Sequence, residues 1–403
     1  MSKKPLNPPK RNKPRFTRIP PTEPFEVNPK DDLPAVLDKL TKISFQGRNL
    51  GKAYQAWADA LRDDTTIMFG LSGAMTPGGM RKLIVHLIEN RMIDCLVSTG
   101  ANLFHDIYES LGHPHYIGSA DADDMELFHK RLDRVFDTYA DEVQFRKLDW
   151  YIGHFMLEVA SERRMGTREF FELLADRLEP HIVEDGIVTA ARKAGVPLYS
   201  PAIADSSYGI AAAEVCFPLQ TMPQIDVMTD VVETAEIALR SKSTSVIYIG
   251  GGTPKNFINQ AELTASGWIM RDLPGHKYAI QFTTDAPHWG GLSGCTFSEA
   301  QSWGKIAERA KMATVHVDAT IALPIVVTAL AKDMKKGLKR KHIPNMKKMY
   351  GQPPPTSKPQ RHYIVDPECE RLDFESLQEQ AKSAKKSARA EKTKKTKKVA
   401  RKK

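Results

Sequence analysis

Cysteines, long apolar runs and the short motifs of several large enzyme classes are scarce or missing in this sequence. The 403 residues include four cysteines and no CxxC pair, so neither a disulfide framework nor a dithiol redox site is expected. The longest apolar run covers residues 321–331, well short of the roughly 18 residues that a membrane-spanning helix needs. The motifs HExxH, GxSxG and GxxxxGK[ST] do not occur, which disfavours zinc proteases, α/β-hydrolases and P-loop kinases.

The remaining composition is that of an ordinary folded protein. Hydrophobic residues make up 41% and charged residues 27% of the chain, proportions that allow a buried core and argue against wholesale disorder. The basic N-terminal stretch lacks the apolar segment of a secretory signal. Together with the few cysteines, this predicts a protein of the reducing cytoplasm without membrane contact.

Charge divides the chain into three parts. Residues 1–18 carry seven basic and no acidic side chains, and residues 381–403 carry twelve basic side chains and one acid, so the chain between them has a net charge of −9. We predict a proline-rich basic arm over 1–30, a folded domain over 31–345, and a linker with a lysine-rich tail over 346–403. Such arms are either solvated, disordered chain or contacts for a polyanion such as RNA, while the acidic body suits a cationic substrate.

Short apolar strands alternate with helical stretches throughout the predicted domain. Because this alternation produces parallel sheets with both faces covered, the sequence predicts an α/β fold with a doubly wound, mostly parallel sheet. A helical excursion over 121–194 has little strand character and is expected to add a helical layer. The predicted strands cover 65–70, 93–98, 197–201, 245–249, 278–283 and 315–317.

Glycine recurs where the predicted strands stop, in the turn 70–73 and in Gly250-Gly251-Gly252. Ligands of such sheets bind beyond the carboxyl ends of the strands, where glycine lets backbone N–H groups and a helix N-terminus approach a diphosphate. These turns predict a bound nucleotide, although tight turns without a ligand explain isolated glycines about as well. Asp318 follows the last strand and would either accept hydrogen bonds from a ribose or cap the next helix.

A second group of candidates lies in a short helix that follows a glycine-rich loop. Glu299 and Trp303 are four residues apart on one helix face, where a carboxylate and an indole would bind an alkylammonium ion. The competing roles are a capping box with Thr296 for Glu299 and core packing for Trp303. Lys305 would form a Schiff base if its amine were uncharged. It would share a site with Trp303 only if Gly304 breaks the helix or if the substrate lies across the end of the helix.

Three histidines and an aspartate cluster after the predicted strand 93–98. His105, Asp106, His113 and His115 are types of side chain that bind zinc. Their spacing matches no metal-binding motif, and the residues around His113 are typical of a turn. No metal site is therefore predicted.

The segment Ser302-Trp303-Gly304-Lys305-Ile306 resembles the deoxyhypusine synthase family, and the likeness extends over residues 34–334. Both basic arms lie outside this stretch. A single such motif would be weak evidence, whereas an ordered set is specific. The other matching motifs, in the order of the family, are Ser44-Phe45-Gln46, Asn49-Leu50-Gly51-Lys52-Ala53, the turn at Gly70, Ser200-Pro201-Ala202, Gly250-Gly251-Gly252 with Lys255, Glu299-Ala300 and Val317-Asp318-Ala319.

This resemblance implies an NAD-dependent aminobutyl transferase that works as a homotetramer with active sites between paired subunits. In the family, NAD takes a hydride from spermidine, the imine is cleaved, and the butylamine fragment is held on a lysine. The fragment then passes to a lysine of a translation factor, or in related enzymes to putrescine, and is reduced. One alternative is a homospermidine synthase-type enzyme with a free diamine as acceptor; another is an NAD-binding protein without catalysis that docks on RNA through its arms.

The resemblance also implies roles for single residues. Lys305 matches the covalent lysine, and Glu299, Trp303, Gly251 and Asn256 fall at positions of the polyamine site. The positions of the NAD site are Ser72, Gly73, Thr99, Gly100, Asp205, Gly251, Gly252, Thr284, Asp285, Asp318 and Ala319.

Four positions depart from the pattern of the family. The histidine after the lysine of GGGxxK is Asn256 here, two carboxylates are replaced by Leu292 and Ile210, and the glutamate after the Thr99 turn is replaced by His105. A buried polyamine needs an anion near each ammonium group, because an unpaired buried charge is costly. The departures therefore leave the identity of the donor and of the acceptor open.

Overall fold

The computed structural model describes residues 20–161, 163–269, 272–290 and 295–351. Leu292 and most of the two predicted arms, residues 1–19 and 352–403, fall outside these ranges. None of the helices in the described part is both long enough and apolar enough to span a bilayer.

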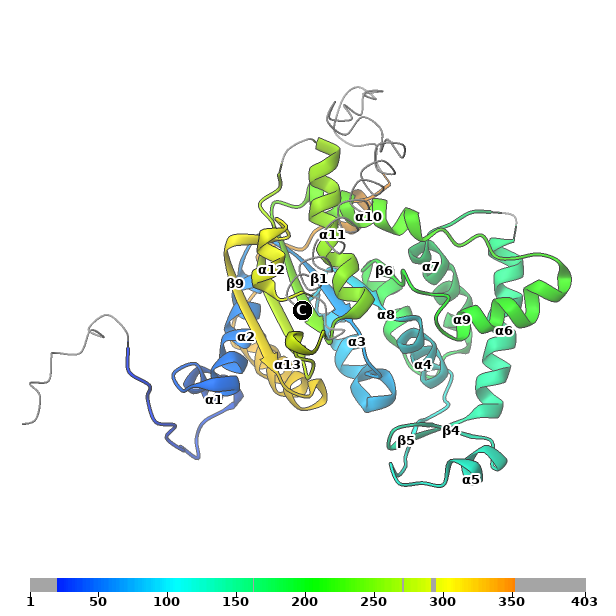
Figure 1. Cartoon of the computed structure of the whole chain (residues 1–403), viewed down its shortest axis with the longest axis horizontal. Helices are drawn as coiled ribbons and strands as arrows, with labels where there is room; N and C mark the ends of the chain where they lie inside the picture. Colours follow the sequence, from blue (N-terminus) through cyan, green and yellow to red (C-terminus); the bar gives the residue numbers. More distant parts are fainter. Residues whose placement is uncertain (1–19, 162, 270–271, 291–294, 352–403) are drawn as a thin grey trace, which may run out of the picture. The chain divides into compact units, whose positions relative to one another are not determined.

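Six parallel strands form the main sheet (Figure 1). They are β1 (Thr66–Leu71), β2 (Cys95–Ser98), β6 (Leu198–Tyr199), β7 (Thr244–Ile249), β8 (His276–Thr283) and β9 (Ile306–His316). Their order in the sheet is β6-β2-β1-β7-β8-β9, and every neighbouring pair is parallel. The chain thus starts in the middle, builds outward on one side and then on the other, with the switch point between β1 and β7. This confirms the predicted α/β fold and gives it the strand order of dinucleotide-binding sheets.

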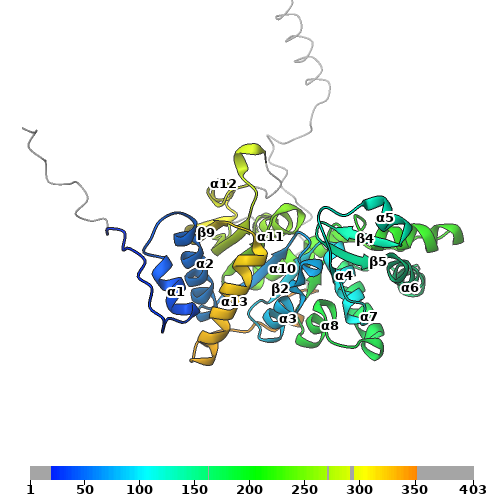
Figure 2. The same cartoon turned by 90° about the horizontal axis from the view of Figure 1, so that it is seen from below.

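Helices cover both faces of the sheet. The helices on one face are α1 (Leu33–Leu40), α2 (Phe45–Arg62), α3 (Arg81–Glu89), α8 (Ile187–Ala194) and α13 (Ala319–Lys335), and those on the other are α10 (Val227–Arg240), α11 (Gly252–Ile269) and α12 (Phe297–Ser302). Figure 2 shows α12 and α13 on opposite sides of the strands. A hydrophobic core lies on each face: the first core is under α1, α2, α3, α8 and α13, and the second core is under α10, α11 and α12. Because side chains alternate along a strand, Phe69 and Ile247 pack into the first core, whereas Met68 and Tyr248 pack into the second.

An additional layer lies beyond β2 and β6. Its helices are α4 (Gly100–Ser110), α5 (Asp124–His129), α6 (Glu142–Ala160), α7 (Thr167–Leu178) and α9 (Ser207–Ala211). The prediction of little strand character over 121–194 is wrong in part, since β4 (Leu132–Val135) and β5 (Thr138–Asp141) form an antiparallel pair that β3 (Tyr116–Ile117) joins. These strands are short, and β4 reads Leu-Asp-Arg-Val, so no strand periodicity is visible in the sequence.

Strand β9 is much longer than the predicted 315–317. It lies at the edge of the sheet, and its first half carries Glu308, Arg309 and Lys311, as is typical of an exposed edge strand. A pattern this rich in charge hides the strand from a search for apolar runs. The register places Ile306 beside His276, the first residue of β8, so the long strand carries the chain along the full length of β8.

The chain after α13 packs back onto the domain. Arg340 forms a buried ion pair with Asp94, and Met346 is buried in the second core. The backbone N–H of Gly351 donates to Glu236 Oε2 at 2.6 Å. Packing in the described part therefore continues to Gly351, past the predicted boundary at 345.

Candidate functional site

The carboxyl ends of the central strands bring most of the predicted cofactor residues to one edge of the sheet. Ser72 follows β1, and its backbone N–H donates to the carbonyl of Ile249 at the end of β7, at 3.0 Å. The Ser72 hydroxyl donates to the Gly251 carbonyl at 2.6 Å, and Gly250 N donates to Phe282 O at 2.8 Å. The turns after β1 and β7, on the two sides of the switch point, are thus in direct contact.

Glycine is required in these turns for two reasons. Gly250 has φ +68° and Gly252 has φ +56°, values that side chains with a Cβ rarely adopt. At Gly100, the start of α4, a Cβ would lie 2.3 Å from Ser206 Oγ, so the loop that carries Asp205 touches this helix. Because α11 begins at Gly252, its first N–H groups stand next to residues without side chains, an arrangement that suits a diphosphate.

The last predicted cofactor residues lie at the ends of β8 and β9. Thr283, which precedes Thr284, accepts a hydrogen bond from Val317 N at 3.0 Å, and its hydroxyl accepts one from Asp285 N at 3.0 Å. Asp318 Oδ1 accepts from the backbone N–H of Thr320 at 2.8 Å, so the capping role considered for Asp318 is present. Ala319 is the first residue of the capped helix α13.

Lys305 lies at the other end of the sheet. Its carbonyl accepts a hydrogen bond from His276 N at 3.0 Å, and His276 is the first residue of β8, whereas Thr283 is the last. Seven residue steps of about 3.3 Å separate these levels by about 23 Å, and a lysine side chain extends about 6 Å. Figure 1 accordingly places α12 and α13 at opposite ends of β9. Within one chain, Lys305 and the cofactor residues do not share a pocket.

The helix before Lys305 carries the capping box that competes with a binding role for Glu299. Thr296 N donates to Glu299 Oε2 at 2.6 Å, and Glu299 N donates to Thr296 Oγ1 at 3.1 Å. The hydrogen bond from the Thr296 backbone keeps the pKa of Glu299 below its usual value. Glu299 is therefore an ionised, exposed carboxylate whose position is fixed by the helix start.

Trp303 and Lys305 lie side by side because the helix stops between them. Helix α12 ends at Ser302, and Gly304 has φ +71°. The turn brings Lys305 Nζ to 5.2 Å from the centre of the Trp303 ring, within the range of a cation–π contact. The indole is 64% exposed, so it does not fill the core and offers a face to solvent or to a ligand.

Sequence reasoning gave no role to Lys255, which is 1% exposed in the first turn of α11. Its Nζ donates to Gln281 Oε1 at 2.9 Å and to the Cys295 carbonyl at 2.6 Å, and Gln281 Nε2 donates to Gly250 O at 2.8 Å. Lys255 thus links the glycine turn to the loop before α12. The helical spacing of Lys255, Ile258 and Glu262, all buried, was an available signal. Asn256, the next residue, is exposed.

His105, found where the resemblance places a glutamate, belongs to a chain of hydrogen bonds. Its Nδ1 lies 2.7 Å from His115 Nε2, and His115 Nδ1 lies 2.6 Å from Glu109 Oε1. Burial lowers the pKa of His105 to about 4, so the imidazole is neutral at physiological pH. In the described ranges, no group of three His, Cys, Asp or Glu side chains is arranged to hold a metal ion.

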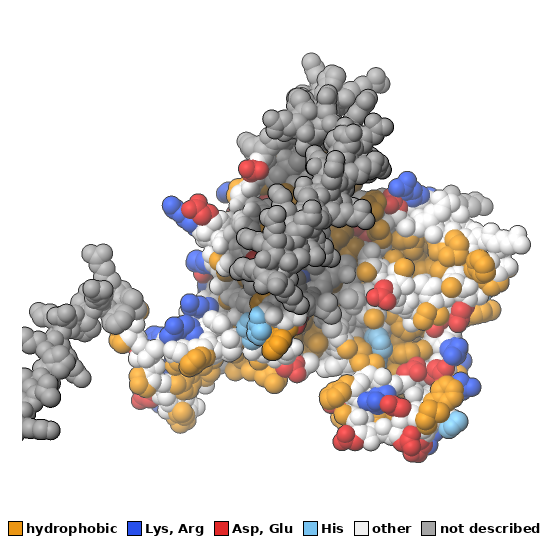
Figure 3. All heavy atoms as spheres, in the orientation of Figure 1, with side chains coloured by type: hydrophobic (Ala, Val, Ile, Leu, Met, Phe, Trp, Pro, Cys, Tyr) orange, Lys and Arg blue, Asp and Glu red, His pale blue; other side chains and the backbone are white. Residues whose placement is uncertain are grey.

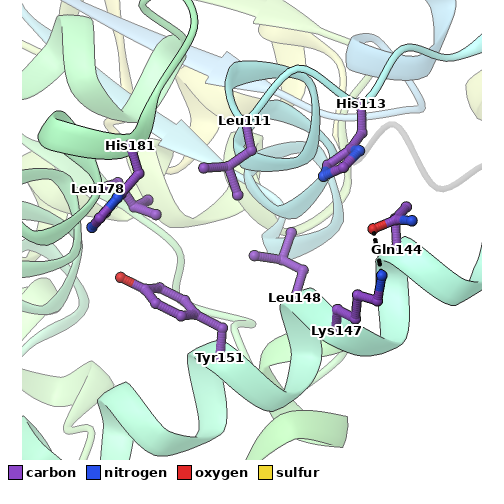
Figure 4. Close-up of a pocket in the computed structure, with 8 residues that line it drawn as sticks. All are labelled: Leu111, His113, Gln144, Lys147, Leu148, Tyr151, Leu178 and His181. Atoms are coloured by element: carbon purple, nitrogen blue, oxygen red, sulfur yellow. Dashed lines mark hydrogen bonds between the residues drawn. The ribbon is translucent and has the colours of Figure 1, made fainter.

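A separate cavity of about 200 Å³ lies in the additional helical layer (Figure 4). Leu111, Leu148 and Leu178 form its apolar walls, and Tyr151 and His181 lie together on one side of it. The cavity is lined by none of the predicted site residues. The site at the sheet is therefore distinct from it.

The buried lysine gives a test of the geometry described above. Burial lowers the pKa of Lys255 to about 8, while the unfolded chain keeps this proton up to about pH 10.4. Between these values the unfolded state binds more protons, so the free energy of unfolding should rise with pH by up to about 1.4 kcal/mol per pH unit. Burial raises the pKa of the Cys95 thiol, and such a group acts in the opposite direction, so the measured quantity is a difference between proteins. From about pH 8 to about pH 10, the slope of the free energy of urea unfolding against pH should be more positive in the wild type than in Lys255→Met. Lys339→Met, an exposed control, should keep the wild-type slope; equal slopes in all three proteins would contradict the burial of a titrating Lys255.

Comparisons with known proteins identify the family of this chain. The family model described as deoxyhypusine synthase matches residues 35–330. "Probable deoxyhypusine synthase 2" of Methanosarcina mazei is 49% identical over 81% of this chain and 93% of its own length, and the protein of the same name from Archaeoglobus fulgidus is 48% identical over 76% and 98%. A crystal structure assigned to a deoxyhypusine synthase of Entamoeba histolytica has a TM-score of 0.53 at 16% identity and covers 77% of this chain and 96% of that one, a likeness of fold. The chain belongs to the deoxyhypusine synthase family.

Proposed function

We propose that this protein is an NAD-dependent aminobutyl transferase that takes its fragment from a polyamine and carries it as an imine on Lys305. The observation that carries the proposal is the Gly304 turn, which places Lys305 Nζ against the exposed Trp303 ring, one helix turn from Glu299. This is a nucleophilic amine beside two groups that attract an alkylammonium ion. Family membership supports the same reaction.

The edge at the switch point would hold the cofactor. Its fit rests on the positive φ of Gly250 and Gly252 and on the N-terminus of α11, which suit a diphosphate. Bound NAD would supply the acceptor for a hydride from the amine and return that hydride to the product. The residues that we assign to it are Ser72, Gly73, Thr99, Gly100, Asp205, Gly251, Gly252, Thr284, Asp285, Asp318 and Ala319.

The amine chemistry would fall to the residues around α12. Lys305, unprotonated, would attack the C=N carbon of the oxidised donor, and the remaining amine would leave with a proton. Glu299 and Trp303 would hold an ammonium group of the donor by charge and by the indole face. The acceptor amine would then displace Lys305 in the same manner, which frees the enzyme. Gly251 and Asn256 would line the donor pocket.

Such a site needs two subunits. The cofactor edge and Lys305 lie at opposite ends of β8 and β9, so Lys305 of one chain would face the cofactor edge of another. A homotetramer with sites between paired subunits meets this requirement. Exposed apolar side chains support an interface: Phe217, Leu219 and Met228 are 71%, 62% and 65% exposed, and hydrophobic side chains gather over the part of the molecule that holds α6 and α9 (Figure 3).

The acceptor is either a lysine of a translation factor or a free diamine, as in a homospermidine synthase-type enzyme. Two observations favour the diamine as second candidate: His105 is neutral, and Ile210 is 50% exposed, where the resemblance places carboxylates. An NAD-binding protein without catalysis, docked on RNA by its basic arms, is the alternative of another class. It predicts salt-sensitive RNA binding without any turnover.

Trapping of the Lys305 imine tests the proposal. The intact protein, incubated with NAD and spermidine and then treated with borohydride, should gain the mass of a reduced butylamine fragment on Lys305. Lys305→Arg keeps the charge but cannot form the imine, and it should gain no mass. A panel that includes putrescine and spermidine, followed by chromatography of the products, separates the two acceptors. No adduct with any diamine or triamine would contradict the proposal.

The dual role of Glu299 can be separated by Glu299→Gln. Glutamine still completes a capping box, so the melting temperature should stay near that of the wild type. The loss of a charge at the ammonium site should raise KM for the polyamine by roughly 10-fold or more. Thr296→Ala is the matched control, because it should cost about 1 kcal/mol of stability and leave the charge in place. An unchanged KM in Glu299→Gln would mean that Glu299 is only a helix cap.

A further inference from the structure

Asp149, on the inner face of α6, is a buried carboxylate without a cationic partner. It is 8% exposed, and its Oδ1 is buried without a hydrogen-bond partner in the described chain. Burial raises the pKa of the Asp149 carboxyl to about 6. An unpartnered oxygen on a buried acid is costly, and no prediction from the sequence involved this residue.

Asp149 lies at the junction of α4, α6 and α9, which are in mutual contact (Figure 1). Phe145, one turn before it, packs edge to face on the His105 ring of α4 at 5.1 Å between ring centres. One turn after it, a Cβ on Gly153 would lie 2.8 Å from the Ala211 carbonyl of α9. Between these two contacts, the side chain of Ser207 is close enough to the Asp149 carboxyl to lower its pKa, against the larger effect of burial. The carboxyl thus stands between the helix that starts at the Thr99 turn and the helix that follows the Asp205 loop.

The charges that face Asp149 leave the junction negative. The charges of Glu214 and Asp133 raise the pKa of the Asp149 carboxyl, and that of Arg146 lowers it. Arg146 is itself paired with Glu142 at 2.8 Å between Nη2 and Oε1. Arg146, the cation among these described neighbours, is thus engaged by another carboxylate, and the buried Oδ1 of Asp149 would attract a cation.

We propose that Asp149 and Ser207 bind one ammonium group of the amine substrate, in the role that the family resemblance gives to a carboxylate at position 210. Ile210 is three residues after Ser207 in α9, half-exposed and apolar, so an acid from α6 would take over from one in α9. This inference rests on the proposed polyamine function. The donor pocket of this chain would thus keep an anion for the ammonium group, but the anion would come from α6 and not from α9.

Steady-state kinetics of the intact oligomer with NAD and spermidine, and separately with putrescine, test the inference. Asp149→Asn keeps the shape of the side chain but removes the charge, and it should raise KM for the amine by about 10- to 100-fold. Its affinity for NAD should match that of the wild type, which shows that the edge at the switch point is folded. Glu214→Gln removes an exposed neighbouring acid and should change KM by less than about threefold.

The pH profile separates binding from a merely structural role. In the wild type, kcat/KM for the amine should fall as pH falls through about 6, because Asp149 becomes protonated, and Asp149→Asn should lack this fall. Ser207→Ala is a second variant in case Asp149→Asn folds poorly, because it removes only the hydroxyl beside the carboxyl. It should raise KM about threefold and keep the fall of kcat/KM at low pH. A wild-type KM and a wild-type profile in Asp149→Asn, with turnover by the wild type intact, would overturn this inference alone. No Lys305 adduct in the wild type would overturn the proposed function and this inference together.

Discussion

The parallel pairing of β8 with β9 is the constraint on which the rest of the site depends. Each strand runs from the Lys305 end of the sheet to the cofactor edge, so the ladder that begins at His276 and Ile306 ends at Thr283 and His316. About 23 Å of hydrogen-bonded sheet separates the two ends, and no rotation of side chains shortens it. Any reaction that needs both ends must bring a second chain to the first. The proposed reaction, which uses both ends, therefore requires paired subunits, and the exposed apolar residues Phe217 and Leu219, which follow α9, would offer a surface for such a pairing.

Buried polar side chains hold the loops of this arrangement in place. Lys255 joins the glycine turn to the loop before α12 through Gln281 and the Cys295 carbonyl. The capping box of Thr296 and Glu299 starts α12, and Gly304 stops it. Because each link is a hydrogen bond or a backbone preference, the position of Lys305 relative to Trp303 follows from the local sequence. The cofactor edge is held in addition by contacts between the turns that follow β1, β2, β7 and β8.

The sequence predicted the α/β fold with its parallel sheet, but it did not predict how segments that are distant in sequence are placed relative to one another. Apolar runs identify strands that are buried on both faces, so the central strands were predicted. Of the charged edge strand β9 only the end was predicted, and the short polar strands β4 and β5 were not predicted. The motif that contains Lys305 was recognised. The end of the sheet at which Lys305 lies, however, is determined by the register of β9 against β8, which no local pattern encodes. Asp149 was missed for the same reason, since its partner Ser207 is distant in sequence. Lys255 was recognisable from its helical spacing.

Subunit complementation tests most directly whether the two ends of the sheet meet across chains. Lys305→Ala removes the nucleophile at one end, and Asp318→Asn removes the charge at the other while asparagine still caps α13. Each variant alone should form no product from NAD and polyamine. Mixed oligomers, made by co-expression of the two chains with different tags, should regain product formation, because some sites combine an intact Lys305 with an intact Asp318 from its neighbour. Mixed oligomers as inactive as their parents would contradict a site shared between two subunits.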